Sequence, residues 1–201
     1  MEREPTPAAP RELRGERVLL RPSEPGDLEP ILRWFNDAEM THFLLSHAPI
    51  GREEEERWIA RTTSEQGASV VYFVICRLED RLPIGTVSLF DIDRRRRSAG
   101  FGIAVGEKSF WGRRLGTDTT RTIVDFGFRD LELERIWLHV HAYNPRGRRA
   151  YEKVGFVVEA TARRALYHRG AWHDVLAMAI LRSEWEALRA WPGDGSRAPS
   201  R

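Results

Sequence analysis

The sequence predicts an α/β fold, in which helices cover both faces of a mixed, mostly antiparallel sheet of about six or seven strands. Residues 98–156 carry the strongest pattern, which reads strand, loop, helix, strand, helix. Before them, apolar runs at 70–76 and 84–90 are joined by a short charged turn, as in an antiparallel meander. The chain has 201 residues, 41% of them hydrophobic, which is enough for one domain with a complete core.

The N-terminal part is predicted to supply one strand and two helices. A strand at 17–21 ends at Pro22, and a helix follows with apolar residues at roughly helical spacing. A second helix begins at 51–56 with four consecutive glutamates, whose carboxylates favour a helix N-terminus. We interpret these glutamates as a solvated helix start rather than as a site for a cationic ligand.

The C-terminal part is predicted to complete the sheet with a strand over 172–181, followed by a short helix over 185–191. Both ends of the chain are rich in proline and charge, which predicts disorder. The expected organisation is therefore a single domain over 13–191 between disordered tails at 1–12 and 192–201.

Residues 111–117, Trp-Gly-Arg-Arg-Leu-Gly-Thr, form a basic turn before a helix predicted over 118–128. Backbone N–H groups at a helix start lack internal partners, and arginine adds permanently charged donors, so the turn predicts a pyrophosphate site. A Walker A loop is excluded because its spacing and its lysine are both absent. A dinucleotide-binding turn is excluded because the loop offers G-x-x-x-G in place of G-x-G-x-x-G.

Residues 98–156 resemble the GCN5-related N-acetyltransferase (GNAT) superfamily, in particular its RimJ/RimL-like branch. The superfamily's pyrophosphate motif, [QR]-x-x-G-x-[GA], falls on residues 111–116. Its pattern N-x-x-[AS]-x-x-x-Y-x-K-x-G-F falls on residues 144–156, with Gly147 at the small-residue position. The chain departs from the pattern at Arg114, where glycine is usual, and at Trp111, where glutamine or arginine is usual.

The resemblance implies an acetyl-CoA-dependent N-acetyltransferase, in which a primary amine attacks the thioester directly through a tetrahedral intermediate. It implies acetyl-CoA as cosubstrate and no metal. It also implies that two central parallel strands, here at 101–105 and 136–140, splay apart to admit the thioester. The residues implied to contact the coenzyme are Ile103, Ala104, Val105, Trp111, Gly112, Arg113, Arg114, Leu115, Gly116, Thr117, Asn144, Gly147 and Tyr151.

The resemblance further implies that Tyr151 is the general acid that protonates the leaving thiolate. A phenol has a reference pKa of about 10 and a thiol one of about 8.5, so the transfer needs help from position and desolvation. A backbone N–H group near Ile103 or Ala104 would stabilise the oxyanion. Where many relatives carry a glutamate as general base, this chain has Gly100, and the nearest carboxylate candidates are Asp91 and Asp93.

The absence of that glutamate bears on the acceptor amine. An α-amine with a pKa of about 7.7–8.0 is roughly 10–15% neutral at pH 7, whereas a lysine-type amine is about 0.04% neutral. We therefore expect an acceptor of low pKa, such as a peptide or protein N-terminus or an amino sugar. Other small-molecule amines, including an antibiotic or a polyamine, stay open. The resemblance implies that the segment 40–47, apolar with two histidines, lies at the acceptor site, which makes it a candidate specificity region; the alternative is a half-buried connector.

Composition excludes several other classes. A net charge of +2 makes nucleic acid an unlikely partner, and the four consecutive arginines at 94–97 read as a solvated loop. The single Cys76 rules out an internal disulfide, and its apolar surroundings predict a buried, inert thiol. His139 and His141 share a strand face without further metal ligands at suitable spacing, so we expect structural or polar-lining roles. No signal peptide or membrane span appears, and we expect a cytoplasmic monomer or homodimer.

Two further readings come from other functional classes. Arg114 and Gly100 make a catalytically weak acyl-CoA-binding regulatory module conceivable. The arginines at 94–97 make an RNA- or ribosome-associated protein conceivable, although no aromatic residues interleave them.

Overall fold

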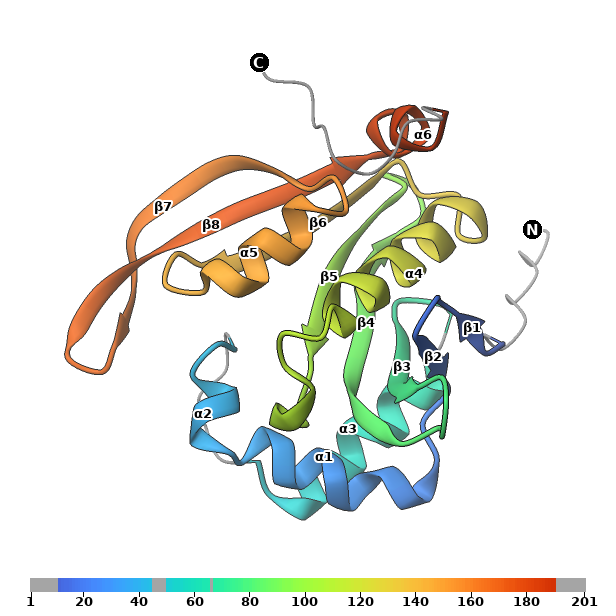
Figure 1. Cartoon of the computed structure of the whole chain (residues 1–201), viewed down its shortest axis with the longest axis vertical. Coiled ribbons are helices and arrows are strands. Elements are labelled where there is room, and N and C mark those ends of the chain that lie inside the picture. The colour runs from blue at the N-terminus through green and yellow to red at the C-terminus, as the bar shows by residue number, and fades with distance from the viewer. Residues whose placement is uncertain (1–10, 45–49, 66, 191–201) are drawn as a thin grey trace.

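The computed structural model describes residues 11–44, 50–65 and 67–190. Its sheet has eight strands in the order β1-β2-β3-β4-β5-β6-β8-β7, and every neighbouring pair is antiparallel except β5–β6 (Figure 1). The strands are β1 (Leu13–Arg14), β2 (Val18–Arg21), β3 (Val71–Arg77), β4 (Pro83–Asp93), β5 (Ser98–Ala104), β6 (Arg135–His141), β7 (Val157–His168) and β8 (Ala171–Leu181).

The α/β class with a mixed, mostly antiparallel sheet is confirmed, but the expected count of six or seven strands was too low. β1 has only two residues, too few to give a pattern. β7 is exposed along most of its length and therefore lacks the apolar alternation that marks a half-buried strand. The predicted tails lie outside the described residues apart from residues 11 and 12, so the limits of the domain stay a prediction.

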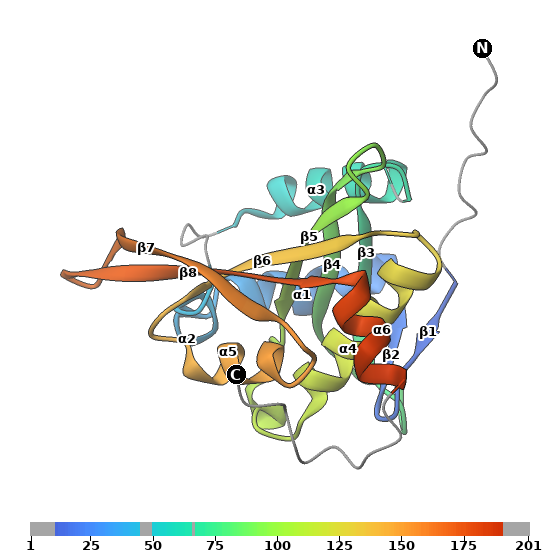
Figure 2. The same cartoon turned by 90° about the horizontal axis from the view of Figure 1, so that it is seen from above.

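Helices cover both faces of the sheet, as expected. Figure 2 shows α3 on one side of the strands and α4, α5 and α6 on the other. The helices are α1 (Leu28–Phe35), α2 (Ala38–Thr41), α3 (Arg52–Ser64), α4 (Leu115–Arg129), α5 (Pro145–Glu152) and α6 (Arg182–Ala190), with short 3₁₀ turns η1 (Pro25–Asp27) and η2 (Lys108–Phe110).

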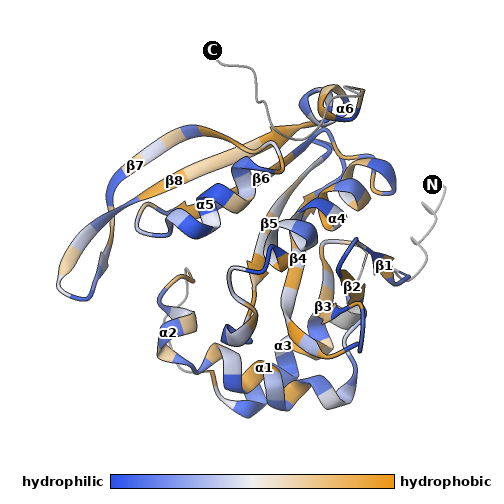
Figure 3. Cartoon of the chain, viewed as in Figure 1, coloured by the Kyte–Doolittle hydropathy of each residue, from blue (hydrophilic) through white to orange (hydrophobic). Residues whose placement is uncertain are grey.

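The main core lies between the sheet and α4. Ile123, Val124 and Phe128 of α4 are fully buried in the same cluster as apolar side chains of the central strands. Hydrophobic residues concentrate on those strands, whereas α5 is largely hydrophilic (Figure 3). Cys76 on β3 is buried, as predicted, and burial raises the pKa of its thiol.

Asp118 fixes the first turn of α4 to the N-terminal hairpin. Its buried carboxylate accepts hydrogen bonds from the backbone N–H groups of Glu16, Arg17 and Val18, at 3.2, 2.8 and 3.1 Å. A carboxylate also suits the first turn of a helix, where the backbone dipole is positive. The position of the helix N-terminus is thus determined by a charged side chain as well as by apolar packing.

A second buried charge joins the end of β2 to the start of α1. The guanidinium of Arg21 donates to both carboxylate oxygens of Asp27, each at 2.7 Å, and both side chains are more than nine-tenths buried. Asp27 also accepts from the backbone N–H of Glu24 at 2.7 Å. This bidentate pair orients the helical segment that leads into α2.

Candidate active site

The parallel strands β5 and β6 separate part-way along their length. They share three residue pairs, the last of which joins Gly100 to Trp137. Beyond that point β5 stays paired with β4 as far as Ala104, and β6 stays paired with β8 as far as His141. Backbone groups of β5 that face the resulting gap lack a strand partner, so an extended ligand can pair with them. The splayed central pair predicted from the sequence is confirmed.

The turn before α4 adopts the backbone conformation of a glycine-rich anion loop. Arg114 is the N-cap of α4 with φ 66° and ψ 3°, in the left-handed region that glycine ordinarily occupies, and Gly112 also has a positive φ of 78°. The N–H groups of Leu115, Gly116 and Thr117, in the first turn of α4, have no acceptor within the helix and point out of its N-terminus. The arginine thus takes the conformation of the glycine it replaces.

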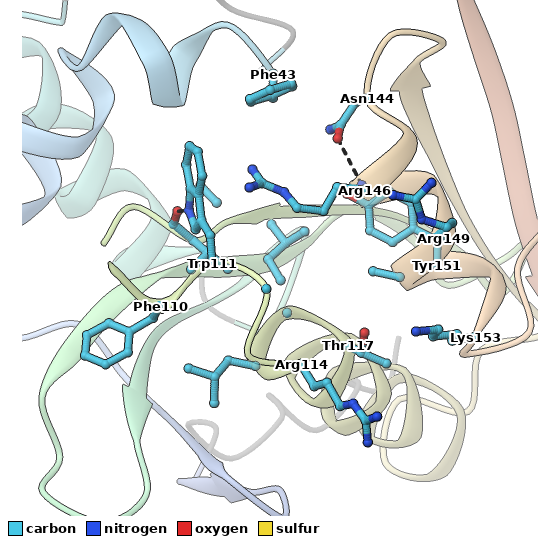
Figure 4. A pocket seen from close by; sticks show the side chains of 18 of the residues that line it. Phe43, Phe110, Trp111, Arg114, Thr117, Asn144, Arg146, Arg149, Tyr151 and Lys153 are labelled. Atoms are coloured by element: carbon cyan, nitrogen blue, oxygen red, sulfur yellow. Dashed lines mark hydrogen bonds between the residues drawn. The ribbon is translucent and has the colours of Figure 1, made fainter. Parts of the chain in front are cut away.

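One cavity of about 260 Å³, the main cavity, joins the gap between the strands to this turn (Figure 4). The sequence-predicted coenzyme residues that line it are Ile103, Ala104, Val105, Trp111, Gly112, Arg114, Leu115, Gly116, Thr117, Asn144, Gly147 and Tyr151. Arg113 is not among the lining residues, and its guanidinium lies 5.4 Å from the ring of Phe110. Asn144 caps α5 by accepting a hydrogen bond from the N–H of Gly147 at 2.9 Å.

Three cations that the sequence analysis missed line the main cavity from α5. They are Arg146, Arg149 and Lys153, spaced three and four residues apart and therefore on one helix face. Among the described residues, neither these three nor Arg114 forms an ion pair, whereas Arg148 on the other face of α5 bonds Glu152 at 2.7 Å. The main cavity is thus a site of uncompensated positive charge, suited to an anionic ligand.

Of the described residues that line the main cavity, Tyr151 alone carries a phenol. Its ring packs edge-on against Phe101, with ring centroids 5.8 Å apart, and lies 6.1 Å from Phe156. Burial raises the pKa of Tyr151 to about 12, because the apolar surroundings disfavour the phenolate. The hydroxyl is therefore protonated at neutral pH and is a potential proton donor.

A comparison with known protein families decides the class to which this arrangement belongs. The family model described as "Acetyltransferase (GNAT) domain" matches residues 17–157. The chain belongs to this family. The superfamily predicted from the sequence is confirmed, and with it the N-acetyltransferase class and acetyl-CoA as the family's cosubstrate.

Individual relatives are more distant. The putative ribosomal N-acetyltransferase YdaF of Bacillus subtilis is 33% identical over 102 residues, which are 51% of this chain and 55% of that protein. The SPbeta prophage-derived uncharacterized N-acetyltransferase YokL of the same organism is 25% identical over 86% of this chain and 94% of its own length. The match to the first of these thus spans about half the relative's length.

Solved structures give the same fold. Spermidine N-acetyltransferase from Vibrio cholerae, in complex with CoA and spermine, has a TM-score of 0.78 at 27% sequence identity. The similarity covers 84% of this chain and 98% of that one.

In this GNAT chain the ring of Phe90 fills the space beside Gly100, the position at which the resemblance led us to look for a glutamate. A Cβ atom added to Gly100 would lie 2.4 Å from an edge carbon of that ring. The ring is held by Trp137 on β6, with ring centroids 5.6 Å apart and an interplanar angle of 82°. The strand position therefore cannot hold a carboxylate side chain unless Phe90 moves.

We expect Gly100→Ala to destabilise the protein by about 1–3 kcal/mol, the usual cost of overpacking a filled site. Urea unfolding measures the effect. In the Phe90→Ala background the same substitution should cost less, because the ring that it meets is gone. Equal costs in both backgrounds would show that Phe90 is not what excludes the side chain.

The structure does not bring Asp91 to the main cavity. Asp91 is exposed, with φ 49°, beside an irregularity in β4 where Asp93 pairs with Ser98. The cavity meets the opposite end of β5, at Ile103 and Ala104. No described residue that lines the main cavity is an aspartate, a glutamate or a histidine. The position of Asp91 therefore does not support a role as the general base.

A second opening, the side cavity, lies beside the first. It is lined by Ala38, Glu39, His42, Phe43, Trp111, Arg146 and Arg169, and it shares Phe43, Trp111 and Arg146 with the main cavity. Met40, Phe43 and Leu44 of the predicted specificity segment line the main cavity, whereas residues 45–47 lie outside the described part of the chain.

Aromatic rings and histidines hold the segment after α2 against the β7–β8 hairpin. His42 contacts His168 at 2.8 Å between ring nitrogens, and the hydroxyl of Tyr143 donates to the carbonyl of His42 at 2.9 Å. His141 is buried, stacks on Tyr143 and contacts the carbonyl of Leu44 at 3.0 Å. His141 thus has the structural role expected, while His139 is exposed.

The remaining candidates have local explanations. The arginines at 94–97 are all exposed, as predicted for a solvated loop, and two of them also bond backbone carbonyls: Arg94 that of Gly67 and Arg97 that of Glu132. Of the glutamates at 53–56, Glu55 is buried, and burial raises the pKa of its carboxyl. Over the described residues, no group of three or more histidine, cysteine or acidic side chains could hold a metal, and no helix is long and apolar enough to cross a membrane.

Proposed function

We propose that this chain transfers the acetyl group of acetyl-CoA to a primary amine of low pKa, such as a peptide N-terminus or an amino sugar. The observation that carries the proposal is the gap between β5 and β6, which opens within one cavity onto the N-terminal turn of α4. A thioester arm that pairs like a strand and a diphosphate that needs N–H donors would require these two features side by side.

The coenzyme supplies an activated acetyl thioester. The N–H groups of Leu115, Gly116 and Thr117 would donate to its diphosphate, with Arg114, Arg149 and Lys153 adding charge. The backbone groups of β5 that face the gap, near Ile103, would pair with the pantetheine arm. The residues present fit such a ligand, because a long anion meets N–H donors and unpaired cations along one cavity.

In the reaction the neutral amine adds to the acetyl carbon, and the tetrahedral intermediate then collapses with cleavage of the carbon–sulfur bond. The amine nitrogen releases its proton to solvent. In our proposal Tyr151 protonates the leaving thiolate, and its phenolate then regains a proton from solvent. No carboxylate or imidazole lines the main cavity in the described part of the chain to remove the amine proton. Amines that are partly neutral at physiological pH, such as α-amines, are therefore the favoured acceptors.

The pH dependence of kcat/KM tests these roles. We expect kcat/KM to rise with the fraction of neutral acceptor and to reach a plateau near the pKa of the amine. Because burial raises the pKa of Tyr151 to about 12, this acid stays protonated below that value, and no falling limb should appear up to about pH 10. A descending limb near pH 8–9 would assign the proton donor to another group.

Thiol release, followed with dithionitrobenzoate across a panel of amines, tests the function itself. We expect acetyl-CoA to bind in calorimetry and an α-amine to be acetylated faster than a lysine side chain at pH 7. Three relatives are named spermidine N(1)-acetyltransferase, so spermidine belongs in the panel as the competing acceptor class. Faster turnover of spermidine than of α-amines would overturn the preference for a low pKa. Coenzyme binding with no turnover of any amine would favour an acyl-CoA-binding regulatory module.

A further inference from the structure

We propose that Arg146 selects acceptors that carry an anionic group, a carboxylate or a phosphate, close to the reacting amine. This inference rests on the proposed acetyl transfer and names the chemical class of its acceptor. It starts from the position of Arg146, which lines both the main cavity and the side cavity. Of the turn at residues 111–117, only Trp111 lines the side cavity. The side cavity therefore lies away from the proposed diphosphate site.

Two aromatic rings hold the Arg146 side chain in place. Its guanidinium carbon lies 3.9 Å from the centroid of the Trp111 ring and 5.3 Å from that of Phe43 (Figure 4). The indole of Trp111 is fixed in turn, because its N–H donates to the carbonyl of Val105 at 2.7 Å. A guanidinium stacked in this way keeps its planar edge of N–H donors available for a carboxylate or phosphate.

Within the described part of the chain, no carboxylate forms an ion pair with this guanidinium. Among the described residues, Arg146 has neither an ion pair nor a side-chain hydrogen bond, and desolvation lowers its pKa although the charge of Glu39 acts against this. Glu39 is the one acidic residue among the described residues that line the side cavity, and it already forms an ion pair with Lys108 at 3.0 Å. Lys108 also forms an ion pair with Asp37, at 2.8 Å. Arg169 adds a second cation to the same cavity, with only a 3.5 Å contact to the carbonyl of Ala38.

The chemistry of the acceptor follows from this balance of charge. A polycationic amine would bring its second charge toward Arg146 and Arg169, whereas an anionic group would form charge-assisted hydrogen bonds with them. The anion would also hold the amine end of the acceptor toward the gap between β5 and β6. A peptide whose second residue is aspartate and a small amine that carries a phosphate share this chemistry.

Matched acceptors test the effect of charge when kcat/KM is calculated for the neutral fraction of each amine, because an anionic group raises the pKa of a nearby amine. The first pair is the dipeptide amides Ser-Asp-NH₂ and Ser-Asn-NH₂, and the second is phosphoethanolamine and ethanolamine. We expect kcat/KM to favour the anionic member of at least one pair by about 10- to 100-fold, the effect of one or two hydrogen bonds to a charged group. The pair that shows the larger ratio identifies the source of the anion.

Variants then assign the preference to Arg146. In Arg146→Gln we expect the ratio to fall to about one, mainly through KM of the acceptor, and in Arg146→Lys to an intermediate value. Arg148→Gln is the matched control, because Arg148 lies on the same helix, bonds Glu152 and does not line either cavity. The ratio in this control should equal that of the wild type.

Binding gives a readout that needs no turnover. We expect the acetylated product of Ser-Asp-NH₂ to bind the CoA-saturated protein more tightly than that of Ser-Asn-NH₂, and Arg146→Gln to abolish the difference. Equal kcat/KM and equal product affinity within both pairs would overturn the proposal while leaving acetyl transfer intact. A variant that weakens CoA binding but keeps the wild-type ratio would also overturn it, because Arg146 would then serve the coenzyme.

Discussion

Tyr151→Phe should lower kcat by about 100-fold or more, the usual contribution of a positioned general acid. The phenyl ring can keep the packing that the tyrosine makes with Phe101 and Phe156, so only the hydroxyl is lost. We therefore expect the affinity for acetyl-CoA, measured by calorimetry, to stay within about twofold of the wild type. Thiol release with the best amine of the panel measures the rate.

The control for this variant is Tyr167→Phe. Tyr167 is near the tip of the β7–β8 hairpin, is 60% exposed and lines neither cavity. Its substitution should leave both kcat and coenzyme affinity unchanged. A Tyr151→Phe rate within about threefold of the wild type would remove this hydroxyl from the chemistry and leave protonation of the thiolate to water or to another group.

The second large effect concerns stability. We expect Asp27→Ala to lower the free energy of unfolding by about 3–5 kcal/mol, because it leaves the buried guanidinium of Arg21 without its partner. The substitution also removes the acceptor for the backbone N–H of Glu24. Urea unfolding, followed by circular dichroism and by tryptophan fluorescence, measures the difference.

Glu29→Ala is the matched control on the neighbouring helix. Glu29 bonds Arg52 at 2.5 Å, but both side chains are more than half exposed, and surface pairs contribute about 0–1 kcal/mol. Similar losses in the two variants would mean that burial of the Arg21–Asp27 pair is not what makes it important. The double variant Arg21→Met/Asp27→Leu should recover much of the loss, since it removes both charges.

The parts of the site that depend on local chain geometry could be predicted from the sequence. The turn at Gly112 follows from residue types at fixed spacing, and Asn144 was implied by the resemblance as a coenzyme contact. The structure places both at the main cavity. Arg149 and Lys153 were missed although their spacing on one helix face was visible in the sequence.

Other features depend on tertiary contacts that no local pattern contains. His42 and His168, which are 126 positions apart in the sequence, contact each other beside the side cavity. Asp91 is close to β5 in sequence, but the antiparallel register places it beside the first residues of that strand, at the end away from the main cavity. The sequence reveals the absence of a carboxylate at Gly100, whereas only the fold reveals that an aromatic ring fills the space.

The short pairing of β5 with β6 also has a mechanical consequence. Three residue pairs of β5 and β6 join a five-stranded half of the sheet to a three-stranded half. In the proposed binding mode, acetyl-CoA would lie in the gap beyond these pairs and contact both halves. Because such a ligand binds the folded state, it would stabilise the fold by an amount that increases with its concentration relative to Kd, and its removal would increase local opening between the halves.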